Sequence, residues 1–588
     1  MLSLIPRRQF LQLASGTVSL ARAQSAAGPR PNVVVILADD QGWGDLSIHG
    51  NRNLSTPAID SLGRDGARFD RFYVCPLCAP TRAEFLTGRY HPRGGVRGVT
   101  AGQERLNTDE TTIAEIFRAA GYRTALFGKW HNGSQHPYHP NARGFEEFYG
   151  FTQGHWGHYF SPELEHNGNL VRGNGYLTDD FTDRAIEFIR RNRRNPFFCY
   201  LALNTPHSPM QVPGNFWLKF SEADLPLRGS RPDLEDLQMT RAALAMCENI
   251  DWNVGRLLSQ LRQLGLEKDT IVVYFSDNGP NSWRWNGGMR GIKGSTEEGG
   301  VRSPLLVRWL AQIRPGTQIP QIAAAIDLLP TLTDLAGLTR PAGKPLDGVS
   351  LKPLLLGQAP HWPDRMIFSL QGKRVSVRTQ RYCLDSEGRL YDMEADPGQS
   401  RDVASERPDV AAQLRAAQKQ WASEMFSLLD TDDRPFPVGY ARFTLLPARD
   451  GVPLGGVRRS SRHPNDSFFT NWRSAEDRIQ WDVEVLHAGN YAADLYYTCP
   501  EADVGSTVEM SFAGQSVSAV IQPAHDPPLV GAQQDRVKRT ESYVKDFRPL
   551  RLGTIRLPKT RAPLTLRAVE VKAGSVADVR YVALTRLD

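Results

Sequence analysis

The chain has 588 residues and a formal net charge of +6, with 40% hydrophobic and 23% charged residues. This length exceeds what a single hydrophobic core holds, so several domains are expected. The small net charge does not indicate a nucleic-acid-binding protein. No stretch approaches the roughly 20 apolar residues that span a bilayer, so we expect a soluble protein that does not cross a membrane.

The first 23 residues have the features of an export signal. Arg7-Arg8-Gln9-Phe10-Leu11 precedes a short, weakly apolar run, and Ala21-Arg22-Ala23 has the small-x-small form of a cleavage site. The paired arginines resemble a twin-arginine signal, with cleavage after Ala23. A frayed amphipathic segment is the alternative. Export would require the export machinery and predicts a periplasmic or secreted protein in an oxidising, calcium-rich compartment.

Residues 31–365 alternate short apolar runs with helical patterns. Val33-Val34-Val35-Ile36-Leu37 is a β-branched run without polar alternation, as expected of a strand covered on both faces. The pattern predicts an α/β domain in which helices sandwich a large mixed, mainly parallel sheet.

Three further segments are predicted after this domain. Residues 366–435 combine short strands with an amphipathic helix over 408–428, which indicates a small α+β subdomain. Residues 436–465 are rich in Pro, Gly, Arg and Ser with little periodicity, so we interpret them as a linker. Residues 466–588 contain strictly alternating runs such as 479–485 and no long helix, which predicts a β-sandwich.

Polar side chains directly follow four of the predicted buried strands. The residues in these positions are Asp39, Asp40, Lys129, His131, His207, Asp277 and Asn278. In open α/β sheets ligands bind at the carboxyl ends of the strands, so these groups should share one edge. Each segment alone is equally consistent with turn formers, helix caps or a hydrogen-bonded histidine, but all four together are hard to attribute to turn chemistry.

The oxygen donors in this set favour a hard cation. Asp39, Asp40, Asp277 and Asn278 supply only carboxylate and amide oxygens, which fit Ca²⁺ or Mg²⁺ and not zinc. Several protein oxygens on one ion favour Ca²⁺ over Mg²⁺.

The six cysteines are too scattered for a disulfide framework. Cys75 and Cys78 form a Cys-x-x-Cys, which is compatible with a redox site or with half of a zinc site. No second Cys-x-x-Cys and no histidine pair at zinc spacing accompany it.

The residues that follow Cys78 indicate a different role for it. Cys78-Ala79-Pro80-Thr81-Arg82 with Leu86-Thr87-Gly88-Arg89 resembles the signature of the type I, formylglycine-dependent sulfatases, which are arylsulfatase-like members of the alkaline phosphatase superfamily. Residues 121–131, the stretch Gly291 to Arg302 and the segment around 390–397 are similar to later segments of that family. The resemblance covers Pro31 to Leu428.

The resemblance implies that a separate maturation enzyme oxidises Cys78 to Cα-formylglycine. It also implies that Ca²⁺ is held by Asp39, Asp40, Cys78, Asp277 and Asn278. The roles it assigns are binding of the nucleophile by Arg82 and Lys129, binding of sulfate by Lys293, protonation of the leaving oxygen by His207 with Lys293, and proton removal by His131. The chain would thereby remove sulfate from a sulfated carbohydrate or aryl sulfate through a formylglycine-sulfate intermediate.

Two alternative functions remain open from the sequence. A formylglycine-dependent phosphonate or phosphate monoester hydrolase would share the acidic metal edge. An inactive glycan-binding protein would instead use the β-sandwich, with an aromatic platform formed by Trp472, Trp481, Tyr491, Tyr496 and Tyr497, although aromatic residues in strands more often belong to the core. Residues 153–159 and 281–285 are rich in aromatic and polar groups and are candidates for lining the substrate pocket.

Overall fold

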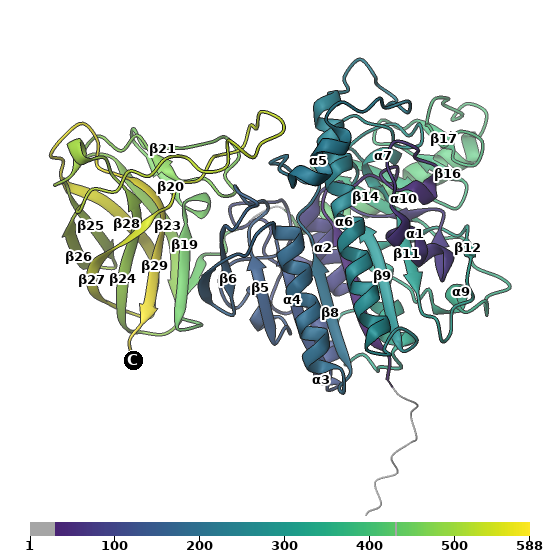
Figure 1. The fold of residues 1–588 in the computed structure, drawn as a ribbon, viewed down its shortest axis with the longest axis horizontal. Helices are drawn as coiled ribbons and strands as arrows, with labels where there is room; N and C mark the ends of the chain where they lie inside the picture. Colours follow the sequence, from purple (N-terminus) through teal and green to yellow (C-terminus); the bar gives the residue numbers. More distant parts are fainter. Residues whose placement is uncertain (1–29, 430–431) are drawn as a thin grey trace, which may run out of the picture.

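The computed structural model describes residues 30–429 and 432–588. The expected export signal at residues 1–23 lies outside the described residues. Within the described part, none of the helices combines the length and the apolar character needed to cross a membrane. A large α/β part and a smaller all-β part lie side by side (Figure 1).

The large part is built on one ten-stranded mixed sheet, which confirms the predicted fold class. Its central strands β9, β1, β8, β4 and β5 run parallel to one another, and β11 and β6 flank them as antiparallel neighbours. In spatial order the strands are β12 (Thr317–Ile319), β2 (Ala67–Phe69), β11 (Leu305–Arg308), β9 (Thr270–Ser276), β1 (Asn32–Ala38), β8 (Phe197–Ala202), β4 (Arg123–Lys129), β5 (Glu147–Phe151), β6 (Glu163–His166) and β7 (Asn169–Arg172).

Helices cover both faces of this sheet. Along β1, Val34 and Ile36 belong to one hydrophobic cluster, whereas Val33 and Val35 belong to another on the opposite face. The first cluster includes α1 (Pro57–Arg64), α4 (Leu177–Asn192) and α6 (Leu237–Gln263); the second includes α2 (Cys78–Thr87), α3 (Ile113–Ala119) and α8 (Leu328–Leu335). Burial on both faces explains why the central strands read as continuous apolar runs.

A small subdomain packs beside the main sheet. Its four antiparallel strands are β14 (Ile367–Gln371), β15 (Arg374–Arg378), β16 (Tyr382–Leu384) and β17 (Leu390–Asp392), and its helix is α10 (Pro408–Ser427). Trp421 of α10 stacks on Phe368 of β14 with 4.8 Å between ring centroids. The strands and the helix lie where the sequence pattern predicts them.

The all-β part, called here the β-domain, consists of two six-stranded sheets around one hydrophobic cluster. One sheet contains β18 (Phe436–Val438), β20 (Val452–Leu454), β23 (Arg478–Val485), β25 (Thr507–Phe512), β26 (Gln515–Val520) and β28 (Arg561–Glu570). The other contains β19 (Phe443–Pro447), β21 (Arg458–Arg459), β22 (Phe469–Thr470), β24 (Gly489–Thr498), β27 (Arg548–Leu557) and β29 (Asp578–Arg586).

The stretch 436–465, interpreted from its composition as a linker, is instead part of the β-domain. Strands β18 and β20 pair with β23, β19 pairs with β29, and β21 pairs with β22. Proline donates no backbone hydrogen bond, so Pro437, Pro447 and Pro453 fit short strands at the margins of a sheet. These prolines produced the composition of a linker in a segment that is folded.

The aromatic platform considered for glycan binding is largely absent from the described β-domain surface. Trp472, Trp481, Tyr491 and Tyr497 are at most 1% exposed and belong to the core. Tyr496 is paired with Tyr581 at 4.3 Å between ring centroids. The first four of these side chains therefore pack in the hydrophobic cluster between the two sheets.

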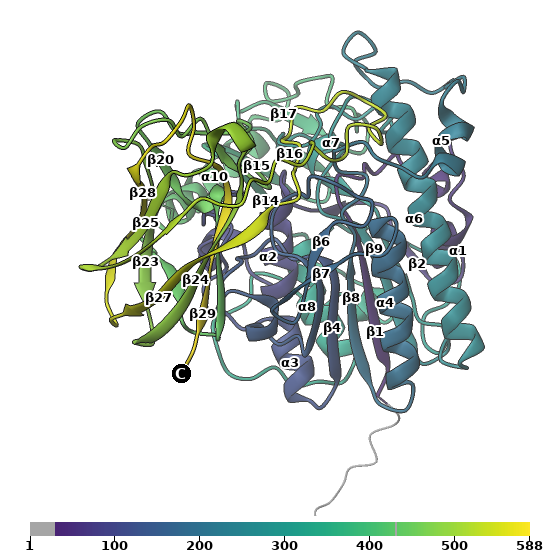
Figure 2. The same ribbon diagram turned by 60° about the vertical axis from the view of Figure 1, so that its left-hand side comes forward.

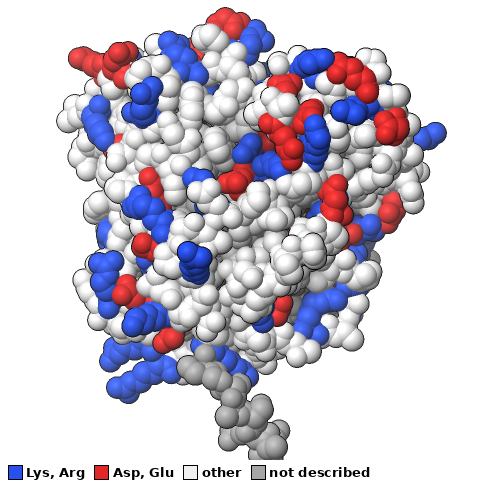
Figure 3. Space-filling model, turned by 90° about the vertical axis from the view of Figure 1, so that its right-hand side faces the viewer, with Lys and Arg blue, Asp and Glu red and all other residues white. Residues whose placement is uncertain are grey.

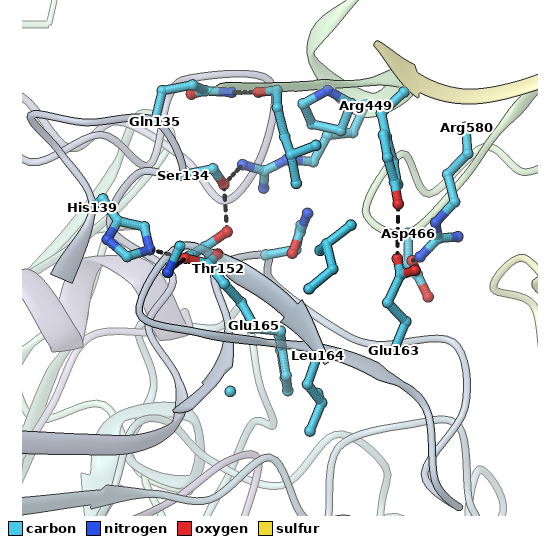
Figure 4. Close-up of a pocket in the computed structure, with 18 of the residues that line it drawn as sticks. Ser134, Gln135, His139, Thr152, Glu163, Leu164, Glu165, Arg449, Asp466 and Arg580 are labelled. Atoms are coloured by element: carbon cyan, nitrogen blue, oxygen red, sulfur yellow. Dashed lines mark hydrogen bonds and ion pairs between the residues drawn. The ribbon is translucent and has the colours of Figure 1, made fainter. Parts of the chain in front are cut away.

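Buried polar contacts join the β-domain to the large α/β part. Arg449 pairs with Glu104 at 2.8 Å, and the Tyr581 hydroxyl donates to Glu163 at 3.0 Å. Figure 4 shows residues of both domains around one cavity at this seam. The two domains are therefore in direct polar contact along their boundary.

The outer face of the α/β part carries charges of both signs. In the view of Figure 3, basic and acidic side chains are interspersed among large uncharged areas. The described residues of that face form no continuous basic surface, in keeping with the small net charge of the chain.

Candidate active site at the carboxyl edge of the sheet

Two neighbouring parallel strands deliver the acidic residues to one place. In the register of β1 and β9, Ala38 pairs with Ser276, so the residues that follow each strand begin side by side. The Asp40 amide donates to Asp277 Oδ1 at 3.1 Å, and Asn278 Nδ2 donates to Asp40 Oδ1 at 2.8 Å. Asp39, Asp40, Asp277 and Asn278 are all at most 1% exposed.

Cys78 lies against this acidic group at the start of α2. It is the first residue of the helix, as the position of Pro80 predicts. The sulfur of Cys78 and carboxylate oxygens of Asp39 and Asp277 lie within 4.8 Å of one another. The Thr81 hydroxyl, one turn into the helix, donates to the Asp277 carbonyl at 2.5 Å and fixes α2 to the end of β9.

Three basic side chains balance the three carboxylates. Lys129 Nζ at the end of β4 lies 2.6 Å from Asp39 Oδ2, and Arg82 on α2 lies 2.8 Å from Asp277 Oδ2. Lys293 Nζ, from the loop before α7 (Glu298–Val301), lies 2.6 Å from Asp40 Oδ1. Such fixed positive charges next to a nucleophile are suited to an anionic substrate.

The donor set fits a hard divalent cation. Among the described residues, Asp39 Oδ1 and Asn278 Oδ1 are buried oxygens without a hydrogen-bond partner. Burial and the neighbouring negative charge of Asp39 raise the pKa of Asp277 to about 6. A divalent ion between these oxygens would satisfy them and favour the ionised carboxylates.

The surroundings of Cys78 do not match those of a redox thiolate. Burial raises the pKa of the Cys78 thiol even though the positive charges of Lys129 and Lys293 lower it. Reactive redox cysteines have lowered pKa values. All six cysteines are buried and free in the structure.

His207, which follows β8, presents one ring nitrogen to the acidic group. Its Nδ1 lies 2.6 Å from the Ser208 carbonyl, which can only accept, so Nδ1 carries a proton. Its Nε2 faces Asp40 Oδ2 at 3.7 Å. Burial and the positive charge of Lys293 lower the pKa of His207 to about 4, so in the free site Nε2 is unprotonated at neutral pH.

His131, which follows β4, is oriented in the opposite sense. Its Nε2 lies 2.8 Å from the Val99 carbonyl and therefore carries the proton. Its Nδ1 is buried and unpartnered among the residues that the structure describes. Burial and the positive charge of Lys129 hold the pKa of His131 well below its usual value. His131 is thus a neutral imidazole with a free lone pair.

The sequence motifs do not single out His155, although it lies within the stretch 153–159 considered for the pocket. Its ring stacks beside His207 with 5.9 Å between centroids. Within the described structure His155 Nε2 is buried without a partner. His155 follows strand β5, as the other polar site residues follow their strands, and this position in the sequence could have marked it as a site residue.

Comparisons with known proteins agree with this architecture. The family model described as Sulfatase matches residues 31–338, and the model described as N-sulphoglucosamine sulphohydrolase, C-terminal, matches residues 293–424. The chain is 33% identical to N-acetylgalactosamine-6-sulfatase of Canis lupus familiaris, over 62% of this chain and 73% of that protein. It is 32% identical to human arylsulfatase A, over 70% of this chain and 90% of that protein.

A solved structure gives the same result. The fold is similar to that of Ps i-CgsB, determined in complex with k-i-k-neocarrahexaose, with a TM-score of 0.61, 29% identity, and coverage of 67% of this chain and 93% of that chain. The α/β fold and a site of paired acidic and basic side chains are typical of hydrolases that act on anionic esters. The chain belongs to the sulfatase family. It is a sulfuric ester hydrolase.

Proposed function

We propose that this protein removes sulfate from a sulfated carbohydrate, using Ca²⁺ and a Cα-formylglycine made from Cys78. The observation that carries the proposal is the convergence of the Cys78 sulfur with Asp39 and Asp277 oxygens within 4.8 Å. The relatives named N-acetylgalactosamine-6-sulfatase and the neocarrahexaose complex of Ps i-CgsB support a carbohydrate substrate. Export through the signal at residues 1–23 is part of the proposal and would place the protein in the periplasm or outside the cell.

The proposed chemistry needs two groups that the chain itself does not encode directly. The hydrated aldehyde at position 78 would supply a nucleophilic hydroxyl for sulfur and a second hydroxyl through which sulfate can be released, while Ca²⁺ would neutralise negative charge on sulfate. Asp39, Asp40, Asp277 and Asn278 would hold the ion.

The remaining residues have roles that follow from their positions. Lys293, which already contacts Asp40, would bind a sulfate oxygen, and Arg82 and Lys129 would hold the hydroxyls at position 78. His207 Nε2 would protonate the departing alcohol oxygen, since a bound anion favours the protonated ring. His131 Nδ1 has the lone pair needed to accept the proton that accompanies sulfate release.

The test combines mass spectrometry with substrate comparison. After co-expression with a formylglycine-generating enzyme, the peptide around Cys78 should carry the aldehyde, and turnover should rise with the fraction converted. An aryl sulfate should be hydrolysed faster than the matching aryl phosphate. Full activity in a protein whose Cys78 is entirely an unmodified thiol would refute the mechanism. Faster cleavage of the phosphate would favour a phosphate or phosphonate ester hydrolase instead.

A further inference from the structure

A long loop of the β-domain reaches the catalytic domain. Residues 521–547 connect β26 to β27 and extend over the catalytic part, where they are coloured yellow in Figure 2. Gln211 Nε2 donates to Asp535 Oδ1 at 2.8 Å and to the Gly531 carbonyl at 2.9 Å. The Arg536 amide donates to the Met210 carbonyl at 2.9 Å. We call residues 521–547 the capping loop.

A second β-domain segment, residues 460–465, is hydrogen-bonded to the capping loop. The Ser460 and Ser542 hydroxyls are 2.6 Å apart, and the Ser461 hydroxyl donates to the Thr540 carbonyl at 3.2 Å. Asn465 Nδ2 in the same segment donates at 3.2 Å to the Val99 carbonyl, the group that also bonds to His131 Nε2. The β-domain therefore contacts the active-site region from two segments that are bonded to each other.

The capping loop brings one carboxylate next to His207. The Ser208 hydroxyl donates to Glu541 Oε1, and Ser208 is the residue whose carbonyl bonds to His207 Nδ1. Glu541 is half-buried, and its second oxygen, Oε2, accepts from the Thr540 amide at 3.2 Å. A carboxylate oxygen has two lone pairs, so each oxygen can accept one further hydrogen bond. Although burial opposes ionisation, the hydrogen bond from Ser208 keeps the pKa of Glu541 below its usual value.

Glu541 reaches the residue next to the proposed proton donor, since Ser208 directly follows His207. His207 Nε2, the proposed proton donor, must face the oxygen that joins sulfur to the rest of the substrate. For Glu541 to contact the substrate, the ring that carries this oxygen must extend from Nε2 toward His155 and Glu541, which both lie beside the His207–Ser208 segment. A carboxylate there accepts hydrogen bonds from hydroxyl groups and repels a second carboxylate.

Glu541 lies outside both segments that match the sulfatase family models, residues 31–338 and 293–424. Its contact with Ser208 is thus a property of the appended β-domain and its capping loop. We propose that Glu541 is a substrate-binding residue that selects a sulfated sugar ring with a free hydroxyl and without a carboxylate. The inference rests on the proposed sulfate ester hydrolysis and adds the substrate class.

The test uses Glu541→Ala and Glu541→Gln in the full-length mature enzyme, with the exposed β-domain residue Glu570→Gln as the matched control. Two probes are compared by kcat/KM. One is 4-nitrophenyl sulfate, which has no sugar hydroxyl. The other is whichever of the galactose, glucose and N-acetylgalactosamine 6-sulfates the wild type hydrolyses fastest. A third probe, glucuronate 2-sulfate, adds a carboxylate to the ring.

Loss of a charged acceptor should lower the ratio of kcat/KM for the hexose sulfate to that for the aryl sulfate by about 10- to 100-fold in Glu541→Ala. Glu541→Gln should raise the relative rate on glucuronate 2-sulfate, whereas Glu570→Gln should change neither ratio. Equal losses on the hexose and aryl substrates would overturn the inference, because they would indicate that Glu541 only positions His207. Hydrolysis of the aryl sulfate with no hexose sulfate accepted would also overturn it, while no sulfate hydrolysis by the wild type would instead refute the proposed function.

Discussion

Cys78, the first residue of α2, and Cys75, three residues before it, lie in opposite environments. Cys78 faces the carboxyl edge of the sheet, where Lys129 and Lys293 contribute positive charge and Asp39 and Asp277 negative charge. Both basic side chains contact carboxylates directly. This region combines a cysteine with fixed charges and unsatisfied oxygens.

Cys75 faces the inside of the fold beneath the same helix. Its sulfur lies within 4.8 Å of donor atoms of Glu84 and His91, and its amide donates to the Thr81 hydroxyl at 2.8 Å. Burial raises the pKa of the Cys75 thiol well above its usual value. Burial also raises the pKa of Glu84 to about 8 and lowers that of His91 to about 4. The group around Cys75 is therefore neutral at pH 7.

The comparison shows that the neighbouring charges, and not the residue types, separate a reactive site from a structural one. Both groups contain a cysteine, an acid and a histidine. Only the group at Cys78 is accompanied by basic side chains, and only there do parallel strands end at a common edge. A buried neutral group can be satisfied by its own hydrogen bonds, whereas buried charges need partners or a bound ion.

The largest expected difference between the two cysteines is in the effect of replacing each of them with alanine. Cys78→Ala should lower kcat by roughly 10³-fold or more, because removal of a nucleophile leaves only binding and charge stabilisation. Cys75→Ala should cost stability, by about 1–2 kcal/mol, with kcat within about threefold of the wild type. Steady-state kinetics and thermal unfolding of both variants test this. Equal loss of kcat in the two would contradict the assignment.

Removal of the proposed metal should affect the group around Cys78 and leave the group around Cys75 unchanged. Dialysis against a calcium chelator should abolish turnover, and added Ca²⁺ should restore it more fully than Mg²⁺ does. Asp277→Asn should weaken Ca²⁺ binding by at least about tenfold, since a negative ligand is lost. Titration calorimetry measures this, with the exposed residue Asp409→Asn on α10 as the control. Full activity in thoroughly chelated enzyme would argue against a metal at this edge.

Substrates with different leaving groups test whether His207 is the proton donor. His207→Ala should lower kcat on a sulfated sugar by about 10²- to 10⁴-fold, because an alcohol leaves poorly without a proton. The loss on 4-nitrophenyl sulfate should be much smaller, since the phenolate is stable by itself. The exposed His487→Ala provides the control. A loss of equal size on both substrates would exclude His207 as the proton donor.

The gathering of acidic residues at one edge of the sheet could be predicted because the signals for it are local in the sequence. Asp39 and Asp277 directly follow buried strands, and parallel strands must end at a common edge. The helix that starts at Cys78 is likewise encoded by the nearby Pro80 and by a glycine that follows its last turn. The end of a strand and the capping of a helix can be recognised from a few neighbouring residues.

The contribution of the β-domain could not be predicted in the same way. The contact between Ser208 and Glu541 joins residues 333 positions apart, and it depends on the path of the whole capping loop. The stretch 436–465 was misinterpreted because prolines at sheet margins give the composition of a linker. No periodic pattern encodes where one domain docks on another.

The last expected effect concerns stability and not turnover, and it arises in the neutral group at Cys75. With a pKa of about 8, Glu84 keeps its proton in the folded chain at pH values where the unfolded chain, with an ordinary pKa of 4.5, has released it. The unfolded state therefore binds fewer protons between these values, so this group's contribution to stability is complete below about pH 4.5 and declines as the pH rises toward 8.

Glu84→Gln keeps a neutral side chain that can still accept the hydrogen bond from the His91 amide at 3.2 Å. Compared with this variant, the wild type should lose up to about 4 kcal/mol of relative stability between pH 5 and pH 8. Thermal unfolding at several pH values, with Glu570→Gln as the exposed control, measures the difference. Parallel pH profiles for the wild type and Glu84→Gln would mean that Glu84 is ionised in the fold, and the contrast between the two cysteines would then lose its electrostatic basis.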